Sequence, residues 1–214
     1  MAFLLRVALP DVPGSLGALA TALGSAGADI EAIEIVERRS DGMVVDDVLL
    51  EPPPQVMPDA LITACHRLDG VNVDWISRYT AGANLSMDLE AVERFTDDPT
   101  RAIARLVEVM PETFRTDWAM ALDRADGELH VMAASSTAPQ LVPEAADWLG
   151  LRKAKVLREV PAWDSTVLAA APARDRKGNG FVVVVGRHGG PEFLPSEVAR
   201  LGHMVSLAAS VQTV

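Results

Sequence analysis

The feature that most constrains the fold is a change from an apolar strand to an amphipathic helix near residue 14. The apolar run from Phe3 to Leu9 is too short for a helix before Pro10, so it predicts a β-strand. Residues 11–14 contain Asp, Pro and Gly and predict a tight turn. Apolar and small residues then recur at helical spacing from Leu16 to Gly27, which predicts a helix of about three turns. A second strand is expected from Asp29 to Glu37.

This turn leaves backbone amides at the helix start without partners inside the helix. They are the N–H groups of Gly14, Ser15 and Leu16. Gly14 has no Cβ, so a ligand can approach its backbone closely, and a helix start of this kind can hold a carboxylate or a phosphate. Pro and Gly also suit a plain strand-to-helix turn, and these residues alone leave both interpretations open.

The rest of the first 80 residues predicts four further elements. Asp41-Gly42 predicts a hairpin turn into a strand from Met43 to Leu50. A helix from Pro58 to Leu68 and a strand from Val71 to Tyr79 complete the order β-α-β-β-α-β. This is the ferredoxin-like arrangement, with two helices on one face of a four-stranded antiparallel sheet. The strands carry more apolar side chains than one covered face requires, so we expect the uncovered face or an edge to pack against a second copy.

The turn and the helix, followed by Ala26-Gly27-Ala28-Asp29-Ile30, resemble the ACT domain family, the small-molecule-sensing modules of many enzymes of amino-acid metabolism. The resemblance covers residues 1–80 and all six elements. It implies paired domains, with an amino acid held where the turn of one copy meets the second strand of the other. The ligand-binding residues that it implies are Asp11, Val12, Pro13, Gly14, Ser15 and Leu16, with Asp29 and Ile30 from the other side.

Asp29 departs from the pattern of ligand-binding members, which often have Asn at this position. An amide donates and accepts hydrogen bonds, whereas an ionised carboxylate only accepts them. Asp29 can therefore pair with an ammonium group of a ligand, but it would repel a carboxylate held within a few ångströms. The departure predicts either a different preferred ligand or an empty site.

The small residues from Thr80 to Asn84 predict a domain boundary. We therefore expect an ACT-like domain over 1–80, a linker over 81–87 and a second domain over 88–214. The elements expected in the second domain are helices at 87–95, 99–110 and 143–149, strands at 118–122, 129–134, 156–160, 166–171 and 181–186, and a closing helix from Pro195.

This second series of elements, with Phe193, Ser196 and Glu197 at the entry to the closing helix, resembles a GAF domain, a sensory fold related to PAS domains. The expected fold class is thus α+β: a ferredoxin-like, ACT-like domain, then a GAF/PAS-like α/β sandwich with a central antiparallel sheet. The residue set of cyclic-nucleotide-binding GAF domains is absent. The single cysteine, Cys65, lies in the other domain, which disfavours a bilin.

The composition excludes several classes of partner. A net charge of −11 without a basic stripe argues against nucleic acid. No apolar run reaches the roughly 18 residues of a membrane helix, so we expect no membrane partner. The start has no basic segment typical of a secretory signal, and a lone cysteine fits a reducing compartment. We expect a cytoplasmic protein.

The sequence shows no pattern typical of catalysis or metal binding. Four histidines lie far apart, without zinc-like spacing. Cys65 and His66 are adjacent on a helix and point in different directions, and Asp46 and Asp47 alternate on a strand and face opposite sides. We expect no cofactor, no metal and no enzyme activity.

These observations predict a regulatory homodimer that binds an amino-acid-like metabolite at the ACT interface, with the GAF-like domain as a second sensor or a signal-transmitting module. The alternative is a structural dimerisation or scaffold protein with vestigial ligand pockets. A third interpretation, an enzyme on a GAF-like scaffold, requires a reactive cluster near Trp118, Ser135 and Trp163.

Overall fold

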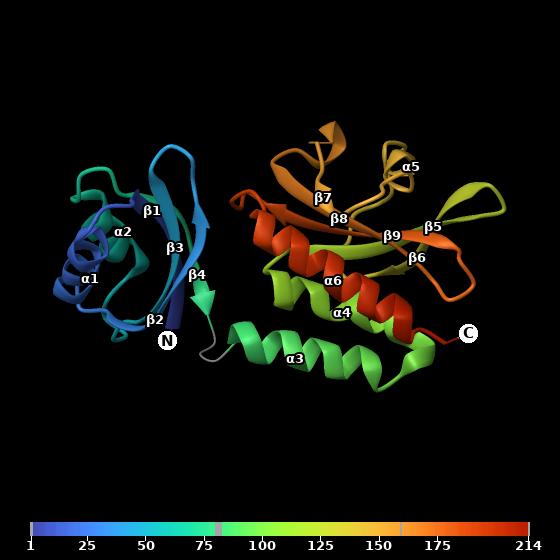
Figure 1. Ribbon diagram of the computed structural model, residues 1–214, viewed down its shortest axis with the longest axis horizontal. Coiled ribbons are helices and arrows are strands. Elements are labelled where there is room, and N and C mark those ends of the chain that lie inside the picture. The colour runs from blue at the N-terminus through green and yellow to red at the C-terminus, as the bar shows by residue number, and fades with distance from the viewer. Residues whose placement is uncertain (1, 80–82, 159, 214) are drawn as a thin grey trace. The chain divides into compact units, whose positions relative to one another are not determined.

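The computed structural model describes residues 2–79, 83–158 and 160–213. The chain forms two compact units, which divide between Ala83 and Asn84 (Figure 1). Residues 80–82 of the expected boundary lie outside the described residues. The helix that follows begins at Ala83, four residues before its expected start at Met87, so residues 83–87 of the expected linker are helical.

Unit 1 consists of six elements in the order that the sequence predicts. They are β1 (Ala2–Pro10), α1 (Ser15–Ser25), β2 (Asp29–Arg38), β3 (Met43–Glu51), α2 (Pro58–His66) and β4 (Asn72–Tyr79). The four strands form one antiparallel sheet in the order β2-β3-β1-β4. β2 and β4 are therefore the edge strands of this sheet.

The core of unit 1 lies between the sheet and the two helices. Side chains that alternate along β1, namely Leu5, Val7 and Leu9, pack with leucines of α1 and α2. Cys65 of α2 is fully buried in this core, and burial raises the pKa of its thiol to about 11. The cysteine is thus a core residue whose thiol stays protonated at neutral pH.

The second face of this sheet differs from the bare apolar surface that the sequence predicts. Leu4, Ala8 and Val45 on this face are only 2%, 2% and 0% exposed. Arg6 lies between them on the central strand, and its Nε and Nη2 donate to the two carboxylate oxygens of Asp47 at 2.7 and 2.9 Å. The expected apolar surface is therefore interrupted by a buried ion pair, while α1 and α2 pack on the other face of the sheet.

Unit 2 contains a five-stranded antiparallel sheet in the order β6-β5-β9-β8-β7. Its strands are β5 (Trp118–Ala125), β6 (Glu128–Ala134), β7 (Lys155–Val156), β8 (Thr166–Arg174) and β9 (Gly180–His188). Its helices are α3 (Ala83–Thr96), η1 (Pro99–Arg101), α4 (Ala102–Phe114), α5 (Ala145–Trp148), η2 (Pro161–Trp163) and α6 (Pro195–Val211).

Besides α3, a strand and a helix of unit 2 differ clearly from the sequence expectation. The strand expected at 156–160 is reduced to β7, which pairs with β8 through two residues. The helix expected to end at Met110 continues through Pro111 to Phe114. Pro111 lies in the last turn of α4 and has no N–H to donate to the Val107 carbonyl, so the helix continues past it without that one bond.

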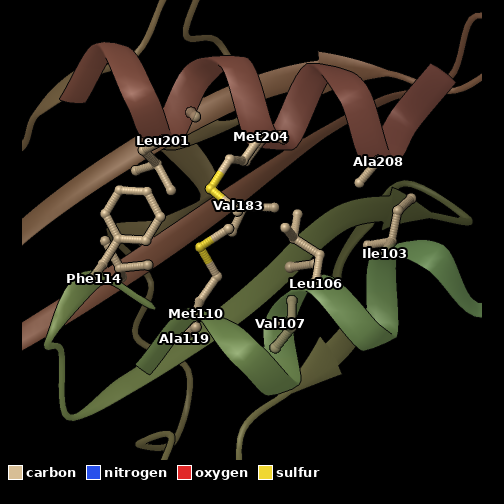
Figure 2. Close-up of a cluster of buried hydrophobic side chains, with 14 of the residues drawn as sticks. Ile103, Leu106, Val107, Met110, Phe114, Ala119, Val183, Leu201, Met204 and Ala208 are labelled. Atoms are coloured by element: carbon tan, nitrogen blue, oxygen red, sulfur yellow. The ribbon is translucent and has the colours of Figure 1, made fainter. Parts of the chain in front are cut away.

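Both faces of the sheet in unit 2 are covered. On one face, side chains of α4 and α6 interlock over β5, β8 and β9, with Met110, Phe114 and Met204 among them (Figure 2). On the other face, Trp118 packs with Trp148 and Trp163. The Trp118 and Trp163 rings lie 5.0 Å apart in an edge-to-face arrangement.

A buried arginine holds the covering helices to the sheet. The Nη2 atom of Arg187 donates to the Phe114 carbonyl at 2.9 Å and to Glu197 Oε1 at 3.0 Å. Its guanidinium also lies 4.4 Å over the Phe193 ring. The guanidinium of Arg187, at the end of β9, is therefore engaged by groups of the protein itself.

We expect Gly186→Ala to destabilise unit 2. A Cβ at Gly186 would lie 2.2 Å from Cε2 of Trp118, which crosses over this position. The overlap forces the indole to move and should lower the free energy of unfolding by about 1–3 kcal/mol. Gly180→Ala on the same strand is the matched control, because a Cβ there meets nothing within 4 Å. Urea unfolding followed by tryptophan fluorescence measures both, and equal midpoints would contradict the expectation.

Candidate functional site

The strand-to-helix turn of unit 1 is open, and it begins α1 without a side-chain cap. Gly14 is the N-cap residue, with φ 98°, and no side chain of the turn bonds to the first amides of the helix. This φ lies in the left-handed region that favours glycine. A Cβ built on Gly14 would meet no atom within 4 Å, so the space beside this backbone is empty of protein.

The prediction of amides without a hydrogen-bond partner is confirmed for two of the three residues. Within the described residues, the N–H groups of Gly14 and Leu16 have no hydrogen-bond acceptor, and the first helical bond runs from Ala18 N–H to the Gly14 carbonyl at 2.9 Å. The prediction is wrong for Ser15, whose N–H donates to the Val12 carbonyl at 3.2 Å because residues 12–15 form a turn of their own. Two free donors therefore point to an anion site at this helix start.

The turn is fixed to the hairpin between β2 and β3. The N–H of Asp11 donates to the Gly42 carbonyl at 2.9 Å. The Asp11 carboxylate forms an exposed ion pair with Arg38 at the end of β2. One acidic and one basic side chain thus flank the open amides.

Apolar side chains beside the turn are exposed to an unusual degree. Val12 and Leu16 are 58% and 38% exposed, and Ile35 on the edge strand β2 is 50% exposed. Pro13 between them is also exposed. An apolar rim around free amides is suited to a second protein surface or to a small ligand.

The structure does not bring Asp29 and Ile30 to the turn within one chain. They begin β2, opposite Glu51 and Leu50, whereas the turn lies at the other end of the sheet, where Arg38 pairs with Val44. Asp29 belongs to a group of acids at its own end. Desolvation, a hydrogen bond with the Glu51 carboxyl group and the charges of Glu51 and Asp29 raise the pKa of Glu31.

A buried acid, Asp46, lies near the turn. From the sequence we expected only that it faces the opposite side of the strand from Asp47. Asp46 is 2% exposed and, within the described residues, its Oδ1 has no hydrogen-bond partner. Burial, together with the charges of Asp11 and Asp47, raises the pKa of Asp46, while Arg38 acts in the opposite direction. An acidic residue at an inward position of an apolar strand is the sequence signal that could have identified it.

The described residues of unit 2 offer no comparable site. The three tryptophans and their neighbours fill the face of the sheet opposite α4 and α6. A surface hollow of about 340 Å³ lies between the start of α4 and the β8–β9 turn, lined in part by Arg101, Lys177 and Asn179. The Ser135 hydroxyl accepts a hydrogen bond from the Ala119 N–H at 3.0 Å, and no histidine bonds to it within the described ranges.

The described residues contain neither a metal-binding cluster nor a membrane-spanning helix. No group of three or more His, Cys, Asp or Glu side chains is placed to hold a metal ion. None of the described helices is both long and apolar enough to span a bilayer.

Comparison with known proteins gives similar folds but no family assignment. No family model matches the chain, and no curated protein matches it. A GAF domain of an Acinetobacter phosphoenolpyruvate-protein phosphotransferase is similar, with 12% identity, 62% of this chain and 93% of that chain covered, and a TM-score of 0.48. The GAF domain/HD domain protein of Geobacter sulfurreducens has 18% identity, 56% and 94% coverage, and a TM-score of 0.44.

A GAF domain of a phosphoenolpyruvate-protein phosphotransferase from Coxiella burnetii gives comparable values: 14% identity, 60% and 94% coverage, and a TM-score of 0.45. These similar structures are GAF domains, the family that the second half of the sequence resembles. Their identities and TM-scores assign this chain neither a family nor a ligand. The ACT resemblance of residues 1–80 stays a prediction.

We expect Asp46→Asn to stabilise the ligand-free protein at neutral pH. Because the pKa of Asp46 is raised in the folded protein, the folded state holds this proton more tightly than the unfolded state does. The resulting contribution to stability is complete at low pH and is lost as the pH rises through the raised pKa. The amide carries no charge, so the variant should gain about 1–3 kcal/mol above that pH and nothing below pH 4.

Asp47→Asn is the matched comparison on the same strand. Asp47 is 6% exposed but accepts two hydrogen bonds from Arg6, so this variant should lose about 3–5 kcal/mol because it removes the negative charge that faces the buried guanidinium. Denaturant unfolding of both variants between pH 4 and pH 8 checks the pair. A destabilised Asp46→Asn protein at neutral pH would contradict this account of its environment.

Proposed function

We propose that this protein is a non-catalytic regulatory protein that binds a small carboxylate-bearing metabolite, most simply an amino acid, at the turn from Asp11 to Leu16. The observation that carries the proposal is the pair of unpartnered amides at Gly14 and Leu16 in an exposed, glycine-begun helix start. A carboxylate placed there accepts both N–H groups and lies at the positive end of the α1 dipole.

The proposal includes a homodimer in which two β2 edges pair antiparallel. In such a pair, the Asp29 end of one strand meets the Arg38 end of the other, because antiparallel strands run in opposite directions. A two-fold axis through the middle of β2 repeats this contact on both sides. Asp29 and Ile30 of the second copy then arrive beside the Gly14 turn, so both groups of residues implied by the ACT resemblance meet only in the dimer.

Unit 2 acts in this proposal as a GAF-like module that transmits the state of the dimer or holds a ligand of its own. Its support is the sheet covered by α4 and α6 on one face and by long connecting segments on the other, which is the arrangement expected from the sequence resemblance. A ligand that bridges two copies shifts the equilibrium toward the dimer by mass action. We also propose a cytoplasmic location and no membrane partner, and the net charge of −11 argues against a nucleic-acid partner.

One observation favours the alternative of a scaffold protein without a ligand. Trp118, Trp148 and Trp163 fill the face of unit 2 opposite α4 and α6 with mutual ring contacts at 5.0 and 5.7 Å. A dimer with a filled second unit and an unused turn would serve only to hold two chains together. The two functions differ in whether any amino acid stabilises the fold.

We expect at least one amino acid to raise the melting temperature of the full chain. At a ligand concentration of about a hundred times Kd, the stabilisation is about 2.7 kcal/mol, which corresponds to several degrees for a chain of this size. Differential scanning fluorimetry with the twenty amino acids measures the shift. Gly14→Val, which places a branched side chain over the free amides, should abolish it. The sensor proposal loses its support if no amino acid shifts the wild-type protein.

We expect the protein to be a dimer in solution, with β2 in its interface. Ile35→Lys places a charge on the exposed side chain of the edge strand and should shift the protein toward the monomer. Met132→Lys is the matched control, because Met132 is an exposed apolar residue of β6 in unit 2. Light scattering coupled to size exclusion separates the outcomes. A monomeric wild-type protein, or an equal effect of both substitutions, counts against the β2 interface.

A further inference from the structure

We propose that Asp46 is the residue that recognises the ammonium group of the ligand whose carboxylate binds the Gly14 turn, so that the site selects amino acids over simple carboxylates. This inference rests on the proposed function and names the chemistry of its ligand more closely.

The position of Asp46 follows from the strand register. Asp46 lies opposite Val7 in the β1–β3 ladder and opposite Ile35 in the β2–β3 ladder. Val7 belongs to the core beneath the helices, and cross-strand neighbours share a face, so the Asp46 side chain lies on the helix-covered face. Asp11 and Arg38, which form the ion pair beside the turn, both act on the charge of Asp46.

The state of this carboxylate points to a missing partner. The residue is 2% exposed, and its Oδ1 is buried without a hydrogen-bond donor in the described parts of the chain. A buried acceptor left without a donor destabilises a fold, so natural chains retain one where it has a use. Asp47, the next residue, is buried to a similar degree but is fully paired with Arg6. The two adjacent acids thus differ: Asp47 has a structural partner, whereas Asp46 Oδ1 has none within the described residues.

An approach to Asp46 from the surface leads past the sheet edge. Ile35, its ladder neighbour on the edge strand, is half exposed, and Val12 and Leu16 of the turn are exposed as well. Rotation of an exposed side chain takes picoseconds to nanoseconds. In the proposal, the Ile35 side chain moves aside so that a small ligand with its carboxylate on the turn amides contacts Asp46.

The turn amides and the Asp46 carboxylate match the two charged groups of an amino acid. The Gly14 and Leu16 amides donate hydrogen bonds, whereas the Asp46 carboxylate only accepts them, and an ammonium group supplies three donors. A carboxylate or phosphate without an ammonium group would leave Asp46 unpaired and add a like charge near it. Among the described residues, Arg38 is the cation that acts on Asp46, and it is engaged by Asp11.

The test compares two kinds of probe on three forms of the full chain. The probes are the amino acid that gives the largest thermal shift and its counterpart without the amino group, as propionate is for alanine. The proteins are the wild type, Asp46→Asn and Asp69→Asn. Asp69 is an exposed acid after α2, so its substitution removes the same charge without touching the site. Titration calorimetry gives Kd for each combination, and a melting curve confirms that each variant is folded.

The wild type should bind the amino acid at least tenfold more tightly than the counterpart. Asp46→Asn should weaken amino-acid binding about ten- to a hundredfold, the value of a charge-assisted hydrogen bond, while its affinity for the counterpart stays the same or rises. Asp69→Asn should behave as the wild type. The comparison of the two probes on the wild type needs no substitution, so it tests the inference whatever the stability of the variants.

The other outcomes separate this inference from the proposed function. If the wild type binds both probes equally, or if Asp46→Asn weakens both equally, the turn binds carboxylates but Asp46 does not recognise the ammonium group. If Asp46→Asn binds the amino acid as tightly as the wild type does, Asp46 does not recognise the ammonium group and the inference is overturned. If the wild type binds neither probe, the proposed function fails and this inference fails with it.

Discussion

A helix that begins at a glycine without a capping side chain leaves its first amides available to another molecule. In α1 this condition results from Gly14, whose φ of 98° turns the chain from β1 into the helix. Ser, Thr, Asp or Asn at the N-cap would satisfy one of these amides from within the chain. The residue that permits the tight turn is thus also the residue that exposes the N–H groups, and the proposed site depends on that single choice.

The surroundings of the turn combine fixed and open groups. Asp11 ties the turn to the β2–β3 hairpin through its backbone and to Arg38 through its carboxylate, so the turn that carries the free amides is fastened to the sheet. The adjacent acids of β3 divide between the two faces of the sheet. Asp47 pairs with Arg6 on one face, and Asp46 is buried without a partner for Oδ1 on the other. A carboxylate that lowers stability beside an open anion site is consistent with a role in binding.

Much of the architecture could be predicted because local signals in the sequence agree with one another. The turn at 11–14, the hairpin at Asp41-Gly42 and the helical spacing of leucines give the order of all six elements in unit 1. Features that depend on tertiary contacts could not be predicted. The extension of α4 through Pro111 and the shortening of β7 belong to this class, because packing in unit 2 decides them.

The site shows the same division between local and long-range information. Unpartnered amides at Gly14 and Leu16 follow from the turn sequence, but the bond from Ser15 N–H to Val12 depends on how the turn closes. The burial of Asp46 depends on which face of β3 it occupies, and alternation along the strand leaves that choice open until the register is known. The separation of Asp29 from the turn within one chain likewise follows from the course of β2 in the sheet.

The central claim is that the amides of this turn bind a carboxylate. The most direct test is a ¹H–¹⁵N NMR titration of the full chain with the amino acid that stabilises it most. We expect the largest downfield proton shifts at Gly14 and Leu16, because both N–H groups gain a charged acceptor. If these two resonances stay unchanged while others move, for example those that line the hollow beside Arg101 and Lys177 in unit 2, the ligand binds elsewhere and the account is contradicted.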